Sequence, residues 1–285
     1  MTDVPSLALN TGAQIPQLGF GVFQVPPPET AAAVGMALEQ GYRSIDTAAA
    51  YRNERGVGEA VAASGIPRDE VFITTKVWND QQGRDTTLAA FERSLERLGM
   101  DHVDLYLIHW PAPGRDRYVE TWKMLEELHA DGRARAIGVS NFQIPHLERL
   151  LDECDVVPAL NQIELSPQLQ QAELRRFHAE HGILTEAWSP LAQGAVLDDP
   201  VIADLAAAHG RTPAQVVLRW HVQLGNVVIP KSVTPSRIAE NIDIFGFELS
   251  DCQRALDTAR EAGFMARWLS RAACAVRRGP ARGRV

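Results

Sequence analysis

Short apolar runs alternate with amphipathic stretches along most of the chain. Apolar runs of this length predict buried strands, whereas apolar residues spaced three and four apart predict one face of a helix. In the first half there are four such pairs. Run 18–21 precedes stretch 29–39, run 42–46 precedes 54–64, run 71–76 precedes 86–98, and run 103–109 precedes 118–130. This order predicts a repeated beta-alpha unit.

The second half continues the same alternation. Run 134–140 precedes stretch 145–151, and run 158–164 precedes 171–180. Run 183–188 precedes two stretches, 201–209 and 213–224, and run 226–232 precedes 236–244. Eight strands with intervening helices predict an α/β fold, a (β/α)8 TIM barrel. Before them, residues 6–10 and 13–19 alternate around Thr11-Gly12, so we expect an N-terminal β-hairpin that covers the bottom of the barrel.

A doubly wound parallel sheet is the alternative architecture. Its phosphate-binding loop would follow the first strand, but the run GFGVFQ carries Gln24 where a GxGxxG motif needs its third glycine. The barrel is therefore favoured.

Composition narrows the class of protein. The 285 residues carry a formal net charge of -8, which argues against a nucleic-acid partner, because such proteins present a basic stripe. Cys154, Cys252 and Cys274 are widely spaced and form no metal-binding cluster, so neither a disulfide framework nor a metal site is predicted. The first residues lack a basic segment followed by an apolar stretch, and no run is long enough to span a bilayer. We expect a cytoplasmic protein without a membrane partner.

Four ionisable residues stand at the ends of three successive predicted strands: Asp46, Tyr51, Lys76 and His109. In a parallel barrel, residues at these strand ends face one mouth and can form one site. A tyrosine beside an ammonium group can donate a proton, because the positive charge favours the phenolate and lowers the phenol's pKa. Taken singly, each residue could be structural: a buried ion pair, a packed aromatic, a core histidine.

A second polar cluster surrounds the last predicted helix. Thr234 is expected to be the N-cap and Pro235 the first helical residue, so Arg237 falls in the first turn, with Lys231 just upstream. A cationic side chain at the positive end of a helix is unfavourable unless a bound anion lies between the side chain and the helix end. The cations here therefore predict a phosphate site. The alternative is a solvated basic turn.

These residues resemble the aldo-keto reductases, and within them the bacterial 2,5-diketogluconate reductase group, from about Leu18 to about Gly263. The resemblance implies NADPH-dependent reduction of aldehydes or ketones by direct hydride transfer. Tyr51 would be the general acid, Lys76 and Asp46 would tune it, and His109 would hold the carbonyl oxygen.

The resemblance also implies the rest of the site. Ser140, Asn141 and Gln162 would bind the nicotinamide carboxamide and Trp188 would stack on the ring, with Ser189 and Leu191 at the pyrophosphate. Lys231, Ser232, Val233 and Arg237 would surround the 2′-phosphate, with Glu240 and Asn241 near the adenine. Phe23, Trp78 and Trp110 would line the substrate pocket, which suits small carbonyl compounds broadly.

The resemblance ends near Gly263. We expect residues 1–263 to form one barrel domain and residues 264–285 to form a divergent, mobile tail, since six arginines and no acidic residue follow Met265.

Other functions are compatible with such a barrel. A non-catalytic nicotinamide-nucleotide-sensing subunit is the alternative to an enzyme, although the four strand-end residues and the aromatic residues favour catalysis. A metal-dependent isomerase is disfavoured, because the strand ends supply no cluster of carboxylates with histidines. A monomer is expected from the resemblance.

Overall fold

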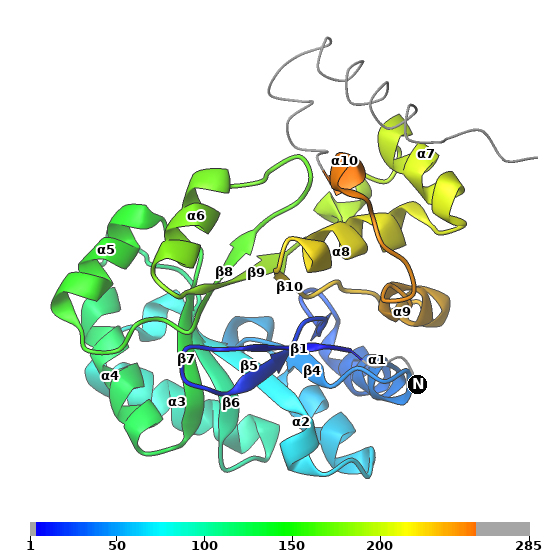
Figure 1. Cartoon of the computed structure of the whole chain (residues 1–285). Helices are drawn as coiled ribbons and strands as arrows, with labels where there is room; N and C mark the ends of the chain where they lie inside the picture. The colour runs from blue at the N-terminus through cyan, green and yellow to red at the C-terminus, as the bar shows by residue number, and fades with distance from the viewer. Residues whose placement is uncertain (1–3, 255–285) are drawn as a thin grey trace, which may run out of the picture.

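Eight parallel strands form the centre of the computed structural model, which describes residues 4–254 (Figure 1). The strands are β3 (Phe20–Gly21), β4 (Ser44–Asp46), β5 (Phe72–Val77), β6 (Val103–Ile108), β7 (Ala134–Ser140), β8 (Leu160–Glu164), β9 (Leu184–Trp188) and β10 (Val227–Val228). Every residue of β5 and β6 is buried. Burial on both faces explains why these strands are continuous apolar runs rather than alternating ones.

Hydrogen bonds between the first and last segments of the sheet close the barrel. The Gly19 N–H donates to the Val228 carbonyl at 2.9 Å, and the Val228 N–H donates to the Gln17 carbonyl at 3.0 Å. Gly21 permits this close approach, because a Cβ atom there would lie 3.1 Å from the Ile229 carbonyl oxygen. The predicted (β/α)8 barrel is confirmed, and an open doubly wound sheet is excluded.

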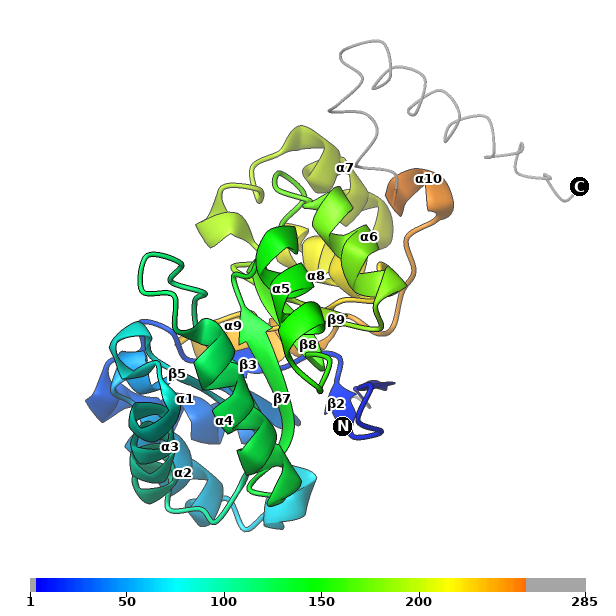
Figure 2. The ribbon, with the colours of Figure 1, turned by 90° about the vertical axis from the view of Figure 1, so that its left-hand side faces the viewer.

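Helices follow the strands and cover the outside of the barrel (Figures 1 and 2). They are α1 (Pro27–Glu39), α2 (Glu54–Ala63), α3 (Arg84–Leu98), α4 (Tyr118–Ala130), α5 (Ile144–Glu153), α6 (Ala172–Glu180), α7 (Pro200–His209), α8 (Pro213–Gln223), α9 (Pro235–Ile242) and α10 (Asp251–Arg254). As predicted, two helices, α7 and α8, separate β9 from β10. Helix α8 begins with a capping box between Thr212 and Gln215.

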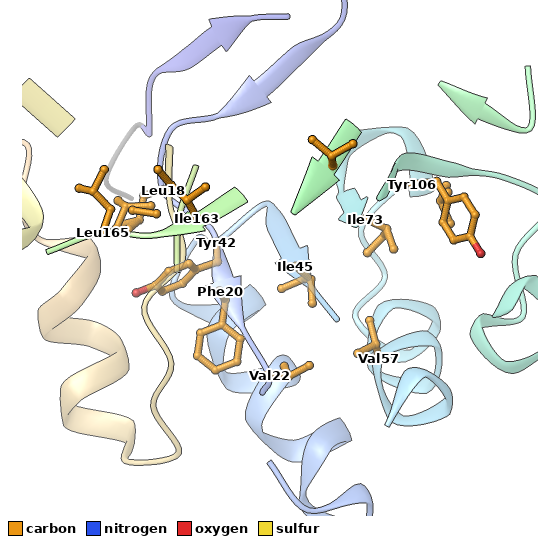
Figure 3. Packing of buried hydrophobic residues seen from close by; sticks show 14 of the residues in the cluster. Leu18, Phe20, Val22, Tyr42, Ile45, Val57, Ile73, Tyr106, Ile163 and Leu165 are labelled. Carbon is orange, nitrogen blue, oxygen red and sulfur yellow. The ribbon is translucent and has the colours of Figure 1, made fainter. Parts of the chain in front are cut away.

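The larger hydrophobic core lies between the sheet and the helices. Ile45 of β4 and Ile73 of β5 are fully buried, as is Val57 of α2 (Figure 3). The Ile45 and Ile73 side chains occupy the outward face of their strands. Packing on this face fixes which residues of each strand point into the barrel, because successive side chains alternate between faces.

A hairpin of β1 (Ser6–Ala8) and β2 (Gln14–Pro16) lies at one end of the barrel (Figures 1 and 2). Its buried residues Leu9 and Ile15 pack in a separate cluster with Phe72 and Leu105 from inside the barrel. Phe72 begins its strand, so the hairpin covers the amino-terminal end. The opposite end, where the strands finish, is the one at which the polar residues gather.

The predicted tail, residues 264–285, lies outside the described residues. Within residues 4–254, no helix is long and apolar enough to cross a membrane.

Candidate active site

The strand ends bring the four predicted catalytic residues together. Asp46 ends β4, and a short 3₁₀ segment, Ala49–Tyr51, follows it. Lys76 is the fifth residue of β5, and His109 directly follows β6. Because β4, β5 and β6 are parallel neighbours, all four residues lie at the same mouth of the barrel.

Lys76 and Asp46 form a buried ion pair. The Lys76 Nζ lies 2.6 Å from Asp46 Oδ1 and 2.8 Å from Oδ2, and it also donates to the Thr47 carbonyl at 2.9 Å. Lys76 is fully buried and Asp46 is 3% exposed. Burial lowers the pKa of the Lys76 ammonium, but the Asp46 charge and Tyr51 outweigh burial and raise that pKa above its usual range. Lys76 therefore stays charged at neutral pH.

Tyr51 lies over this ion pair. The Lys76 Nζ is 5.2 Å from the centre of the Tyr51 ring. Asn53, two residues further on, is buried and holds the segment in place: Thr47 Oγ1 donates to Asn53 Oδ1 at 2.7 Å, and Asn53 Nδ2 donates to the Val22 carbonyl at 2.9 Å. Asn53 is not among the residues predicted from the sequence, because a single asparagine after a turn carries no distinctive signal.

The acidity of Tyr51 reflects two opposing effects. Burial raises the pKa of the phenol, and the Lys76 charge lowers it, as expected from the sequence. Burial is the larger effect, however, so the pKa of Tyr51 is raised overall. The expectation that the Tyr51 pKa falls towards neutral pH is wrong for the protein without ligands. The phenol therefore remains protonated.

His109 stands beside Tyr51 as a neutral imidazole. The two ring centres are 5.5 Å apart, and the Trp78 ring lies 5.0 Å from His109 on another side. Burial and the Lys76 charge lower the pKa of His109 to about 3. Its buried Nδ1 has no hydrogen-bond partner among residues 4–254. A neutral imidazole can donate one hydrogen bond to a substrate oxygen.

Aromatic side chains surround this mouth. The Phe23 ring lies 5.0 Å from the Tyr51 ring. Phe23 is 55% exposed and Trp110 is 41% exposed, although both are large apolar residues. Together with Trp78, they give the mouth the apolar walls that a small carbonyl compound could contact.

The residues assigned to the nicotinamide form a connected network. Ser140 Oγ donates to the Gln162 carbonyl at 2.9 Å, and Asn141 Nδ2 donates to the His109 carbonyl at 3.0 Å. Trp188 Nε1 donates to Asn141 Oδ1 at 2.9 Å. The network therefore links the ends of β6, β7, β8 and β9 and orients the half-buried Trp188 ring.

Nine non-glycine residues among residues 4–254 adopt left-handed backbone conformations, all in the segments that follow the strands. Four of them are Gln24, Arg52, Asn141 and Ser189, with φ angles of 59°, 60°, 64° and 47°. Each follows directly after a predicted site residue. Such conformations cost on the order of 1–3 kcal/mol each and are concentrated at functional sites. The backbone is thus turned sharply where these strands end.

Glu186 is an additional buried acid at this mouth, and it is not among the residues predicted from the sequence. It lies in β9, is 1% exposed, and its Oε2 accepts a hydrogen bond from Gln162 Nε2 at 2.7 Å. Burial, followed by repulsion from Asp46, raises the pKa of Glu186 to about 8. Glu186 precedes Trp188 by two residues and so faces the same side of the strand, but this spacing alone does not show that the carboxyl group is buried.

The second polar cluster lies at the start of α9. Thr234 is the N-cap and Pro235 the first helical residue, as predicted, but the Thr234 side chain makes no capping hydrogen bond. Ser232 Oγ instead accepts from the Thr234 N–H at 3.1 Å. Lys231 and Arg237 are exposed, and within residues 4–254 neither forms an ion pair. This helix start has the charge and the open N–H groups that an anion requires.

The remaining predicted cofactor residues differ in their surroundings. Glu240 accepts a hydrogen bond from Thr212 Oγ1 at 2.6 Å, so its carboxylate joins α9 to the start of α8. Asn241 is 5% exposed and Val233 is 40% exposed. Leu191 packs partly against the main core, and Ser189 lies just beyond β9.

These groups together fit a phosphorylated nicotinamide dinucleotide. Gln162 Oε1 accepts no hydrogen bond from the described residues, Trp188 offers an aromatic face, and Lys231 and Arg237 supply exposed cations about an open helix start. No group of three or more histidine, cysteine, aspartate or glutamate side chains within residues 4–254 could hold a metal ion. The fold and site thus define an oxidoreductase barrel of the kind that handles carbonyl compounds.

Comparison with known proteins identifies the family. The model of the Aldo/keto reductase family matches residues 17–257, and the chain belongs to this family of oxidoreductases. An aldo-keto reductase of Mycolicibacterium smegmatis is 59% identical over 246 residues, which cover 86% of this chain and 90% of the relative. Methylglyoxal reductase DkgA of Escherichia coli is 54% identical over 251 residues, 87% of this chain and 90% of the relative.

A solved structure agrees with this assignment. The crystal structure of a Gox0644 mutant in complex with NADPH is 51% identical and superposes with a TM-score of 0.86, covering 89% of this chain and 92% of that chain.

Proposed function

We propose that this protein reduces small aldehydes and ketones, α-dicarbonyl compounds and keto sugars among them, to alcohols with NADPH, and that Tyr51 is the general acid. One observation carries the proposal: the protonated Tyr51 phenol lies over the buried Lys76–Asp46 ion pair, with the neutral His109 ring beside it. A proton donor, a positive charge that stabilises the resulting phenolate and a hydrogen-bond donor to oxygen are what carbonyl reduction requires.

NADPH, when bound, supplies the hydride to the carbonyl carbon. His109 donates a hydrogen bond to the carbonyl oxygen and fixes its approach to Tyr51. Tyr51 Oη gives its proton to that oxygen as negative charge develops there, and the Lys76 ammonium stabilises the phenolate that remains. Asp46 holds Lys76 in place through both carboxylate oxygens.

The cofactor residues divide into two groups. Ser140, Asn141 and Gln162 bind the nicotinamide carboxamide, and Trp188 stacks on the ring. Lys231, Ser232 and Arg237 bind the 2′-phosphate at the start of α9. The lone exposed cations there support a preference for NADPH over NADH, because NADH has no 2′-phosphate to pair with them.

The substrate class follows from the mouth of the barrel. Phe23, Trp78 and Trp110 offer apolar contacts but few polar ones, which suits small carbonyl compounds of varied structure. The similarity to a methylglyoxal reductase supports α-dicarbonyl compounds as the first substrates to test. We further propose that residues 1–263 act as one barrel domain and that the protein is a cytoplasmic monomer.

A substrate panel tests the proposal. The purified protein is mixed with NADPH and, in turn, methylglyoxal, simple aldehydes, keto sugars and keto acids, and loss of the reduced nicotinamide absorbance is followed. Turnover with at least one carbonyl compound, faster with NADPH than with NADH, is expected. Tight NADPH binding without turnover of any compound would contradict the proposal and favour a nucleotide-sensing subunit.

A further inference from the structure

Glu186 and Asp46 hold the same amide group between them. Gln162 Nε2 donates to Glu186 Oε2 at 2.7 Å and to Asp46 Oδ2 at 2.8 Å. Gln162 is paired with Glu186 across the β8–β9 ladder, whereas Asp46 belongs to β4 on another part of the barrel wall. All three residues are at most 3% exposed. The contacts are therefore interior ones, formed without competition from bulk water.

The two contacts fix the orientation of the Gln162 amide. An amide nitrogen carries two hydrogens, and both are used here. Turning the amide over would place Gln162 Oε1 against the carboxylate of Asp46, which has no proton to donate, and would lose the hydrogen bond from Nε2 to Asp46 Oδ2. Gln162 Oε1 is consequently kept as the available acceptor, and no described residue donates to it.

We propose that Glu186 is a positioning residue of the cofactor site: it holds the Gln162 amide so that Oε1 accepts a hydrogen bond from the nicotinamide carboxamide N–H2 group. The inference rests on the proposed role of Gln162 in NADPH binding. Glu186 Oε2 can accept from Gln162 Nε2 whether the carboxyl group is protonated or ionised. Asp46 Oδ2 is shared between Gln162 Nε2 and Lys76 Nζ, so without Glu186 the amide would keep one of its two contacts, and that one on a shared oxygen.

Binding measurements on variants test this role without relying on turnover. Glu186→Met has a side chain of similar length and offers Gln162 no carboxyl oxygen, whereas Glu186→Gln keeps an acceptor oxygen. Dissociation constants are measured for NADPH and for 2′,5′-ADP, which carries the 2′-phosphate but no nicotinamide. The latter probe reports on the fold and on the α9 site alone.

Loss of this positioning should weaken NADPH about tenfold in Glu186→Met, the worth of roughly one hydrogen bond. The same variant should bind 2′,5′-ADP within about twofold of wild type, and Glu186→Gln should bind both ligands nearly as wild type does. In a Gln162→Met background, adding Glu186→Met should weaken NADPH no further, since Glu186 acts through Gln162.

Several results would overturn the inference. They are wild-type NADPH affinity in Glu186→Met, equal weakening of both ligands, or additive effects of the Gln162 and Glu186 substitutions. Should Glu186→Met fail to fold, a tenfold loss of NADPH affinity in Glu186→Gln with 2′,5′-ADP unaffected would equally contradict the acceptor role. Failure of the wild-type protein to bind NADPH would instead refute the proposed function.

Discussion

Lys76 Nζ lies between both carboxylate oxygens of Asp46, at 2.6 and 2.8 Å, beneath the ring of Tyr51. The ion pair is buried, so neither charge is solvated by water. Each charge therefore depends on the other, and the pair acts as one unit in stability as well as in catalysis.

Lys76→Met, compared with a double variant, should separate the contribution of the ion pair to stability from its contribution to catalysis. The substitution leaves Asp46 as an unpaired buried charge, which should cost about 3–5 kcal/mol of unfolding free energy. It should also lower kcat about 100-fold or more, because the phenolate of Tyr51 loses its stabilising cation. The double variant Lys76→Met/Asp46→Asn is the control: urea denaturation should show stability partly restored, while kcat stays low. Recovery of both would contradict the catalytic role of Lys76.

Arg237→Ala tests the phosphate site at the start of α9. Loss of one charge-assisted contact should weaken NADPH binding by about 1.5–3 kcal/mol and leave NADH binding nearly unchanged. Fluorescence titration with both nucleotides measures this. Arg176→Ala, at an exposed position on α6, is the matched control and should change neither affinity. Equal weakening of NADPH and NADH by Arg237→Ala would show that Arg237 does not contact the 2′-phosphate.

Asn53→Ala should disturb Tyr51 more than it disturbs the cofactor. Asn53 ties the segment after β4 to the loop after β3, and its loss should cost about 1–3 kcal/mol of stability. We expect a fall in kcat that exceeds any change in NADPH affinity. Asn10→Ala, which loses two side-chain hydrogen bonds in the hairpin at the opposite end, should leave kcat unchanged. Equal kcat values in both variants would rule out this positioning role.

Acid should destabilise the protein through its buried histidines. Burial lowers the pKa of His178 from about 6.5 to about 4. Between these values the unfolded chain binds the proton more readily than the folded chain does, so stability falls as pH drops below about 6.5, by up to about 1.4 kcal/mol per pH unit. His178→Gln should reduce the slope of unfolding free energy against pH, measured by urea denaturation between pH 4 and 7. His181→Gln, at an exposed position directly after α6, should leave that slope unchanged. An unchanged slope in His178→Gln would refute this origin of the acid sensitivity.

The sequence predicts the barrel well because its periodicity is strong. The run VFITTK indicates a buried strand, and the structure places β5 at Phe72–Val77. The grouping of Asp46, Tyr51, Lys76 and His109 also follows from their positions at strand ends, since a parallel barrel leaves those ends no other place to meet. These features depend on local pattern and topology alone.

Other features require the three-dimensional structure. The raised pKa of Tyr51 results from burial exceeding the effect of Lys76, and no sequence pattern gives the relative size of two such effects. Glu186 escaped prediction because an acidic residue in a short strand is usually an exposed one. Its inward direction becomes informative only once Gln162 and Asp46 are seen on either side of the same amide.

The central claim is that Tyr51 gives the proton to the substrate oxygen. The most direct measurement compares wild type with Tyr51→Phe in single-turnover reduction of methylglyoxal, or of the best substrate in the panel, with NADPH affinity measured in parallel. Removal of a general acid should lower the rate about 100-fold or more and leave the NADPH dissociation constant within about threefold of wild type. A Tyr51→Phe protein that turns over at a near-normal rate with NADPH bound would contradict the account.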